Sequence, residues 1–263
     1  MLPALWVAKT GLSAQDTNLT VISNNLANVS TTGFKRDRAE FADLLYQIRR
    51  QPGAQSTQDS ELPSGLQVGT GVRIVGTQKS FVAGSLQTTE NPLDMAVNGR
   101  GFFQILQPDG TVSYTRDGTF HLNSDGQIVT ANGYALEPAV VVPNDAQTFT
   151  VGQDGTVSIT TAGNPAAQVI GNIQTADFIN PAGLQAIGDN LFLETAASGA
   201  PQVGTPGLNG FGTTQQQTLE NSNVSTVEEL VNMITTQRAY EMNSKVISTA
   251  TRCSRSSPSS CKP

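Results

Sequence analysis

The feature that most constrains this chain is a seven-residue apolar repeat near its beginning. A first column of the repeat holds Leu5, Leu12, Leu19 and Leu26, and a second column, three residues later, holds Ala8, Gln15, Ile22 and Val29. Two such columns are the a and d positions of a coiled-coil helix. Asn24, Asn25 and Asn28, which lie outside the two columns, are poor helix formers, so the isolated helix should be marginally stable. We therefore predict a helix that becomes ordered when it packs against a partner.

A second helix is predicted near the other end of the chain. Ser225 and Glu228 have the spacing of a capping box, which marks a helix N-terminus. Beyond this start, one side of the predicted helix carries apolar residues at Val227, Leu230, Val231, Ile234, Met242 and Val246. We expect the two helices to pack together as one coiled-coil layer.

The segment between the helices reads mainly as β structure. Residues 34–50 place Phe41, Leu44, Leu45 and Ile48 at helical spacing, and 51–65 reads as an extended arm or flexible linker. From Leu66 onward the apolar period becomes two. Four Asx-Gly pairs follow at intervals of seven or eight residues, and each predicts a tight hairpin turn: Asp109-Gly110, Asp117-Gly118, Asp125-Gly126 and Asn132-Gly133.

These patterns predict an α+β fold, in which N- and C-terminal helices pair as a coiled-coil layer and a central antiparallel domain of short strands lies between them. The predicted boundaries are 1–32 for the N-terminal helix, 33–65 for a helix or extended arm, 66–220 for the β-rich outer domain, 221–250 for the C-terminal helix and 251–263 for a tail. The tail has no apolar stripe, and we expect it to be disordered.

Composition argues against several classes of function. The net charge is −6 and the basic residues are scattered, which argues against a nucleic-acid or anionic-membrane partner. Cys253 and Cys261 are the two cysteines and His121 is the one histidine, so the folded part offers no Cys nucleophile, disulfide framework or His/Cys metal cluster. We predict no catalytic residues, no cofactor and no metal. We also expect no cleaved secretory signal and no transmembrane span.

Three separated motifs resemble those of the bacterial flagellar basal-body rod and hook family. They are the segment Leu26–Lys35, the central block Asn91–Phe103 followed by Tyr114–Gly118, and the C-terminal segments Leu219–Val224, Glu228–Val231 and Gln237–Glu241. The motifs occur in the family's order and the resemblance covers residues 1–250, so the chain is identified as a member. The stretch Leu62–Arg73 is most similar to members that form the distal rod, whereas hook members carry a large extra domain.

The resemblance implies a structural subunit and not an enzyme. Family members polymerise helically into the rod, which crosses the periplasm and transmits torque from motor to hook. The implied partners are further copies of the chain, proximal-rod, hook-side and ring proteins of the basal body, and the type III export apparatus. No nucleic acid and no lipid insertion are implied. The implied location is the flagellar basal body, reached without a cleaved signal peptide.

On this interpretation the functional residues lie on the helices and in the first motif. The predicted inter-subunit coiled-coil seam consists of Leu5, Leu12, Leu19, Ile22, Leu26, Val29, Val227, Leu230, Val231 and Ile234, and the family motif of Asn28, Thr31, Gly33, Phe34 and Lys35. Two alternatives remain at this stage. The chain could be a proximal-rod or hook paralogue, or a secreted carbohydrate-binding β protein whose terminal helices merely dimerise.

Overall fold

The computed structural model describes residues 2–53, 55–57, 60–61, 63–161 and 164–255. It divides into two compact units. The first, which we call the helix–ribbon unit, consists of Met1–Leu26, Asp37–Gln78 and Ser225–Pro263. The second, which we call the body, consists of Ala27–Arg36 and Lys79–Val224. Two helices and many short antiparallel strands confirm the predicted α+β class.

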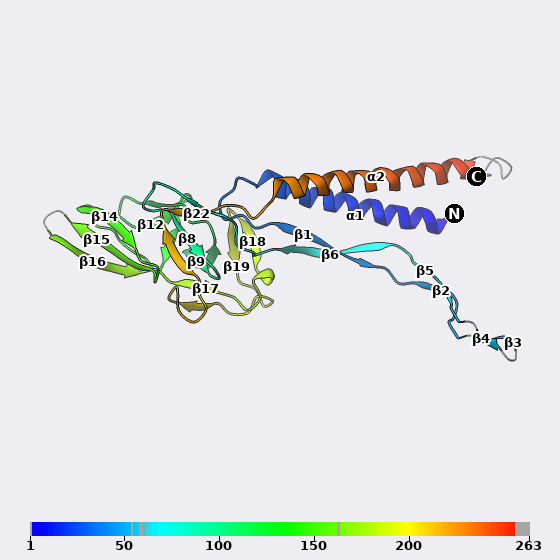
Figure 1. The fold of residues 1–263 in the computed structure, drawn as a ribbon, viewed down its shortest axis with the longest axis horizontal. Coiled ribbons are helices and arrows are strands. Elements are labelled where there is room, and N and C mark those ends of the chain that lie inside the picture. Colours follow the sequence, from blue (N-terminus) through cyan, green and yellow to red (C-terminus); the bar gives the residue numbers. More distant parts are fainter. Residues whose placement is uncertain (1, 54, 58–59, 62, 162–163, 256–263) are drawn as a thin grey trace. The chain divides into compact units, whose positions relative to one another are not determined.

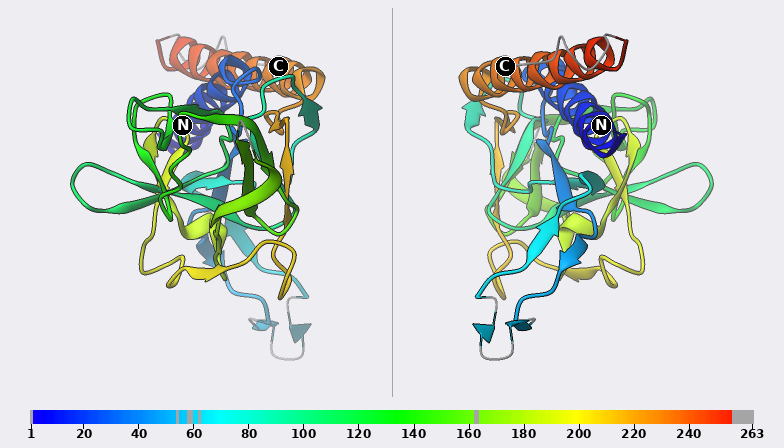
Figure 2. Two further views of the ribbon diagram at one scale, coloured as in Figure 1. Left: turned by 90° about the vertical axis from the view of Figure 1, so that its left-hand side faces the viewer. Right: turned by 90° about the vertical axis from the view of Figure 1, so that its right-hand side faces the viewer.

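The helix–ribbon unit contains both predicted helices, α1 (Leu2–Ala27) and α2 (Thr226–Arg255). They lie side by side and run in opposite directions (Figures 1 and 2). Helix α2 continues five residues beyond its predicted end at 250, because no Gly or Pro interrupts it there. The rest of the predicted tail, residues 256–263, lies outside the described residues. Over the described residues, neither helix combines the length and hydropathy needed to cross a membrane.

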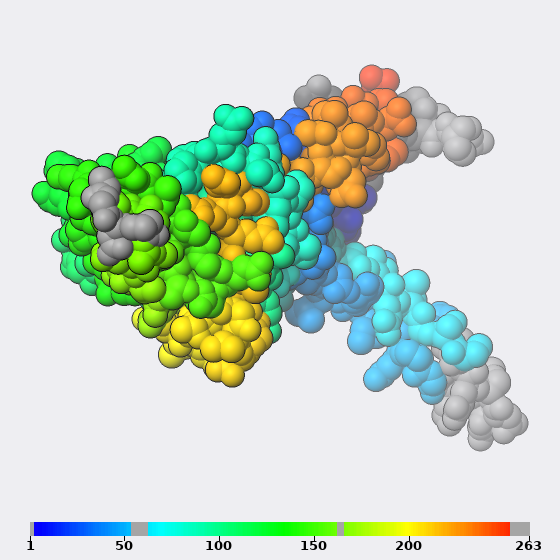
Figure 3. All heavy atoms as spheres, turned by 60° about the vertical axis from the view of Figure 1, so that its left-hand side comes forward, coloured from blue at the N-terminus to red at the C-terminus, as the bar shows by residue number. Residues whose placement is uncertain are grey.

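The remainder of this unit is a long two-stranded ribbon. Strand β1 (Asp37–Asp43) pairs with β6 (Val72–Lys79), β2 (Gln47–Arg50) with β5 (Leu66–Val68), and β3 (Gln55–Thr57) with β4 (Ser60–Glu61). Figure 3 shows the ribbon in blue and cyan as a narrow arm. Residues 66–79 therefore belong to the ribbon, although the sequence analysis assigned them to the β-rich domain.

The helix predicted for residues 34–50 is wrong, because β1 and β2 occupy this stretch. The helical spacing of its apolar residues would need a surface to pack on, yet Leu45 is 90% exposed. Instead, the backbone pairs with a distant segment rich in strand formers: the Leu44 amide donates to the Gly71 carbonyl (2.9 Å), and β6 begins with Val72.

The body is built from short strands. They are β7 (Leu86–Thr88), β8 (Met95–Asn98), β9 (Phe102–Leu106), β10 (Val112–Thr115), β11 (Phe120–Leu122), β12 (Ile128–Thr130), β13 (Ala135–Glu137), β14 (Ala146–Val151), β15 (Thr156–Thr161), β16 (Asn164–Asn172), β17 (Thr175–Asp177), β18 (Gln185–Gly188), β19 (Leu191–Leu193), β20 (Gln202–Gly204), β21 (Thr213–Gln216) and β22 (Thr218–Glu220), with a 3₁₀ turn at Pro181–Gly183. The main sheet has the order β11-β12-β13-β9-β10-β19-β18, and β17 joins it through β9. Smaller sheets are β14-β15-β16, β21-β8 and β22-β7.

Three of the four predicted Asx-Gly turns connect paired strands, and one does not. The pairs at 109–110, 125–126 and 132–133 join β9 to β10, β11 to β12 and β12 to β13. At Asp117-Gly118 the chain instead passes between two strands that are not partners. There the Asp117 carboxylate accepts a hydrogen bond from the Thr119 hydroxyl (2.8 Å), and the Gly118 carbonyl accepts one from the Met95 amide (3.1 Å). Tertiary packing overrides the local turn preference at this position.

Strand β9 divides the core of the body into two clusters. Its side chains alternate between opposite faces of the sheet. Phe103 and Ile105 belong to a larger aliphatic cluster, and Phe102 belongs to an aromatic cluster with Tyr114 and Phe178. The central block of the family motif thus supplies the beginning of this strand, including one residue of each cluster, Phe102 and Phe103.

Candidate assembly surface and buried ion cluster

The contact between the two helices includes small and polar residues. The Asn18 amide donates to the Thr236 hydroxyl (3.1 Å), and Gly11 faces Asn243, whose amide nitrogen would lie 3.2 Å from a Cβ at position 11. Among the described residues of α2, the buried ones are Glu229 and Thr236. Glu229, Thr236 and Asn243 are spaced by seven, so they share one face of α2. Met233 and Ile247 lie near this face and are half-buried, whereas other apolar residues of α2 remain exposed.

The opposite face of α2 carries an apolar stripe, which we define as Val227, Leu230, Val231 and Ile234. These residues follow the i, i+3, i+4, i+7 spacing of one helix face. Their exposed fractions are 69%, 46%, 54% and 49%, in that order. Met242 and Val246 are exposed farther along the same helix. The apolar stripe is thus an uncovered surface on a regular, rigid element.

The predicted seam residues of α1 are less exposed than those of α2. Ile22 is buried, whereas Leu5, Leu12, Leu19, Leu26 and Val29 are half-buried. Near the start of the helix, Trp6 is 57% exposed, and the Lys9 ammonium lies over its ring at 5.5 Å. The structure therefore does not gather the ten predicted seam residues at one in-chain contact. It leaves four of them open on α2 and five partly open on and just after α1.

Helix α1 is fixed to the ribbon by polar contacts along its length. Near its beginning, the Thr10 hydroxyl accepts from the Val72 amide (3.4 Å). Near its end, the buried Asn25 side chain donates to the Asp37 carbonyl (2.8 Å) and accepts from the Asp37 amide (2.9 Å). Asn25 is a weak helix former, but at this position its side chain forms hydrogen bonds with both backbone polar groups of the first residue of β1.

The family motif residues lie in the segment that follows α1, which we call the N-terminal strap (residues 27–36). The Thr31 hydroxyl donates to the Asn28 side chain (3.2 Å), and both residues are half-buried. Gly33, Phe34 and Lys35 are buried in the body. Gly33 has φ +68°, and a Cβ there would approach the Asp117 nitrogen to 2.6 Å, so glycine is required by both conformation and space.

A second segment, the C-terminal strap (residues 218–224), lies against the N-terminal strap within the body. It ends two residues before Thr226, where α2 begins. The Gly33 amide donates to the Glu220 carbonyl (2.8 Å), and the Arg36 amide donates to the Asn223 side chain (2.7 Å). The Asn223 amide group in turn donates to the Ser80 carbonyl (2.8 Å). The chain's two connections to its helices therefore meet on the body.

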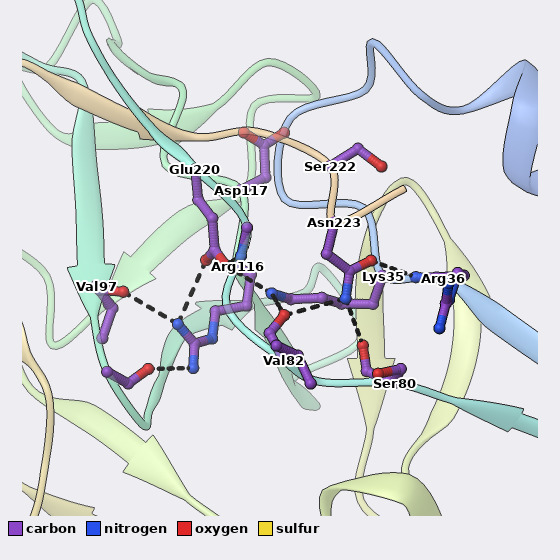
Figure 4. A network of polar contacts seen from close by, with 12 residues as sticks. Lys35, Arg36, Ser80, Val82, Val97, Arg116, Asp117, Glu220, Ser222 and Asn223 are labelled. Carbon is purple, nitrogen blue, oxygen red and sulfur yellow. Dashed lines mark hydrogen bonds and ion pairs between the residues drawn. The ribbon is translucent and has the colours of Figure 1, made fainter. Parts of the chain in front are cut away.

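Between the straps lies a buried ion cluster of Lys35, Arg116 and Glu220 (Figure 4). The Lys35 ammonium lies 2.6 Å from Glu220 Oε1, and Arg116 Nη1 lies 3.3 Å from Glu220 Oε2. All three side chains are almost completely buried. The Arg116 guanidinium also donates to the carbonyls of Val97 (3.1 Å) and Gly99 (2.6 Å). Two cations thus share one carboxylate in the interior.

Burial opposes the charges of both cations. Desolvation lowers the pKa of Lys35, and the attraction and hydrogen bond of Glu220 partly oppose this change. Desolvation likewise lowers the pKa of Arg116, against the attraction of Glu220 and, more weakly, of Asp177. Glu220 therefore supports the charged form of both neighbours. The cluster is a structural ion group and not a metal site, and the described residues contain no group of three or more His, Cys, Asp or Glu that could hold a metal ion.

Comparisons with known proteins agree with this arrangement. Three family descriptions match the chain: "Flagella basal body rod protein" over residues 5–35, "Flagellar hook protein FlgE/F/G D1 domain" over 96–159 and "Flagellar basal body rod FlgEFG protein C-terminal" over 215–256. The flagellar basal-body rod protein FlgG of Buchnera aphidicola (Schizaphis graminum) is 53% identical over 95% of this chain and 96% of its own length. This chain belongs to the flagellar basal-body rod family.

Similar proteins from distant bacteria extend this result. FlgG of Caulobacter vibrioides is 50% identical over 95% of both chains, and FlgG of Bacillus subtilis is 38% identical over 95% of this chain and 96% of its own length. The flagellar hook protein FlgE of Helicobacter mustelae is 40% identical, but it matches 52% of this chain and 30% of its own length. The predicted structural subunit of the flagellar rod is therefore confirmed, and the hook alternative is not favoured.

The three motifs that carried the family resemblance converge in the ion cluster. Lys35 comes from the first motif, Arg116 from the central block and Glu220 from the C-terminal segment. Lys35 was among the predicted site residues, but its partners Arg116 and Glu220 were not, because nothing in a sequence shows which charged residues are buried together. The available signal was their position inside the motifs that carry the family resemblance, since charged residues that are buried are almost always paired.

Proposed function

We propose that this chain is a subunit of the distal flagellar rod and that it polymerises helically through the apolar faces of α1 and α2. In this proposal, the polymer is the drive shaft that transmits torque from the motor to the hook. The FlgG relatives are named rod proteins and match this chain over nearly their full lengths, which supports a rod subunit.

The observation that carries the proposal is the apolar stripe on α2. Its four residues are about half exposed, and they lie on the side of α2 opposite to the Asn18–Thr236 contact between the two helices. Burying a Val, Leu or Ile completely is worth about 1.5–3 kcal/mol. The stripe therefore offers a few kcal/mol for each subunit contact even after the area already buried is discounted. Apolar residues of α1 from a neighbouring copy are the proposed partners, as in a coiled coil.

The remaining parts of the proposal concern partners and location. We propose that the rod contacts proximal-rod, hook-side and ring proteins, spans the periplasm and is exported by the type III apparatus without a cleaved signal. It performs no catalysis, and it uses no nucleic acid and no lipid insertion. The weak helix formers Asn24 and Asn25 of α1 support this route, because they lower the cost of unfolding this helix before export.

The ribbon is proposed to brace one subunit against the next. Its exposed apolar side chains support this role, since Leu45, Ile48 and Val75 are all uncovered in the single chain. Deleting residues 47–68 and closing β1 onto β6 with an Asn-Gly turn should give filaments that bend more in electron micrographs. A filament of unchanged rigidity would refute the bracing role.

The polymer proposal is tested by following purified protein over a concentration series. Circular dichroism and sedimentation report helix content and size, and negative-stain electron microscopy reports the form of the product. We expect helix content to rise as helical filaments appear. A chain that stays monomeric with constant helicity at every concentration would contradict the proposal, because the helices would then need no contact with a second copy.

A further inference from the structure

The two straps are held in the body by each other as well as by the strands. Lys35 and Gly33 of the N-terminal strap both bond to Glu220 of the C-terminal strap, and the Arg36 amide bonds to Asn223. The straps are more than 180 residues apart in the chain. The N-terminal strap follows α1 directly, and the C-terminal strap is separated from α2 by Ser225. Their docking therefore links the two ends of the chain.

The C-terminal strap has a complete site without the N-terminal strap. Arg116 is fixed by the carbonyls of Val97 and Gly99, which belong to the strands and loops of the body. When Glu220 docks beside it, one buried cation faces one buried anion. The Gly84 amide adds a hydrogen bond to Glu220 Oε1 (2.8 Å), and the Asn221 amide donates to the Ser85 carbonyl (2.9 Å).

The N-terminal strap makes its own hydrogen bonds to the body through Thr32, but the ion-pair partner of its buried Lys35 lies on the C-terminal strap. Without Glu220, the buried Lys35 ammonium would keep one contact, the Val82 carbonyl at 3.0 Å, and would lie near the uncompensated Arg116. Two buried cations with no anion between them repel each other and each lose their hydration. Asp177, the next acidic residue acting on Arg116, contributes less than Glu220 and already pairs with Arg100 at 3.0 Å.

We propose that the ion cluster makes docking of the N-terminal strap conditional on a seated C-terminal strap. Glu220 enters first beside Arg116, and Lys35 closes over it. Opening follows the reverse order, so the N-terminal strap can leave alone, whereas the C-terminal strap cannot leave while Lys35 stays buried. This order keeps the N-terminal strap releasable without unfolding the rest of the body, and it prevents the strap from docking before the C-terminal strap is in place.

Hydrogen exchange of backbone amides in the full chain tests this order. The Gly33 and Arg36 amides report the N-terminal strap, and the Asn221 amide reports the C-terminal strap. In the native chain we expect Gly33 and Arg36 to exchange faster than Asn221. Glu220→Gln should speed exchange of the N-terminal strap amides by about 100-fold or more, because two cations then remain buried with no anion.

The decisive variant is the double substitution Glu220→Gln with Lys35→Met. It removes the second of the two cations left without an anion, so that Arg116 is the one charged group remaining in the cluster, and protection of Gly33 and Arg36 should return to within about tenfold of the native rate. Lys35→Met alone leaves the Arg116–Glu220 pair balanced and should keep both straps protected. A double variant as open as Glu220→Gln alone would overturn the proposal, as would native Asn221 exchanging faster than Gly33. The Ile128 amide in β12 serves as the check that the body remains folded.

Discussion

The ammonium of Lys35 and the carboxylate of Glu220 lie 2.6 Å apart in the interior of the body, although 185 positions separate them in the sequence. Removing one partner of such a buried pair leaves an unpaired charge, at a cost of about 3–5 kcal/mol. We therefore expect Glu220→Gln to lower the free energy of unfolding of the body by about this amount. Denaturant unfolding monitored by fluorescence or circular dichroism measures it. The exposed pair Arg38–Glu40 gives the matched control, because Glu40→Gln should cost less than about 1 kcal/mol.

Gly33 should tolerate substitution much less well than another left-handed glycine of the body. In Gly33→Ala the new Cβ meets the backbone of Arg116 and Asp117, so the loss of stability should clearly exceed the roughly 1–2 kcal/mol of a positive φ alone. Gly110 has φ +84° with open space around it, so Gly110→Ala should cost only the conformational part. Equal losses for both variants, measured by thermal unfolding, would contradict the close packing described here.

Tyr114 should make the body less stable in strong alkali. Burial raises the pKa of its phenol above the ordinary 10.0, and the negative charge of the Glu194 carboxylate raises it further. Tyr114 and Glu194 both line a surface groove of about 950 Å³. Above pH 10 the unfolded chain then loses this proton before the folded chain does, so stability falls as pH rises. Below pH 10 the phenol is neutral in both states and has no such effect.

The measurement for Tyr114 is the unfolding free energy at about pH 9 and pH 11. Tyr114→Phe should show a smaller loss between these two values than the native chain. Glu194→Gln should give an intermediate loss, because desolvation is the larger cause and remains. An identical pH dependence for native chain and Tyr114→Phe would show that the phenol titrates alike in both states.

The contact of α1 with α2 should depend on the small size of Gly11. A leucine there has to displace Asn243, and overpacking of this kind costs about 1–3 kcal/mol even though leucine is the better helix former. We expect Gly11→Leu to increase proteolysis within α1 in the monomer. Ser13 is exposed on the same helix, so Ser13→Leu should leave the cleavage rate unchanged or lower.

Local pattern was sufficient for the two helices and for most of the hairpins. The seven-residue repeat located α1, the capping box located the start of α2 within one residue, and three Asx-Gly pairs sit in hairpin turns as predicted. These signals succeed because the interactions that produce them are close in sequence. Helix α2 shows where local pattern is insufficient. The spacing of its apolar residues predicts an apolar stripe, but it does not show whether another part of the same chain covers that stripe.

Long-range pairing accounts for what the sequence did not reveal. Residues 34–50 carry a helical pattern but form strands because their partners lie at 66–79. The Asp117-Gly118 pair has the sequence of a hairpin turn but does not form one, because the Gly118 carbonyl accepts a hydrogen bond from the Met95 amide of a distant strand. The ion cluster assembles from three motifs, and the identity of the anion that balances Lys35 depends on the complete fold.

The central claim is that the apolar stripe of α2 drives assembly, and a charge placed in it gives the most direct test. Val231 is 54% exposed in the single chain, so Val231→Asp should leave the monomer folded. The matched control is Ser244→Asp, which places the same charge on an exposed polar position of the same helix. Sedimentation velocity over a concentration series is the measurement. We expect the native chain and Ser244→Asp to form large helical assemblies while Val231→Asp remains monomeric. Assembly of Val231→Asp at native concentrations would contradict the account.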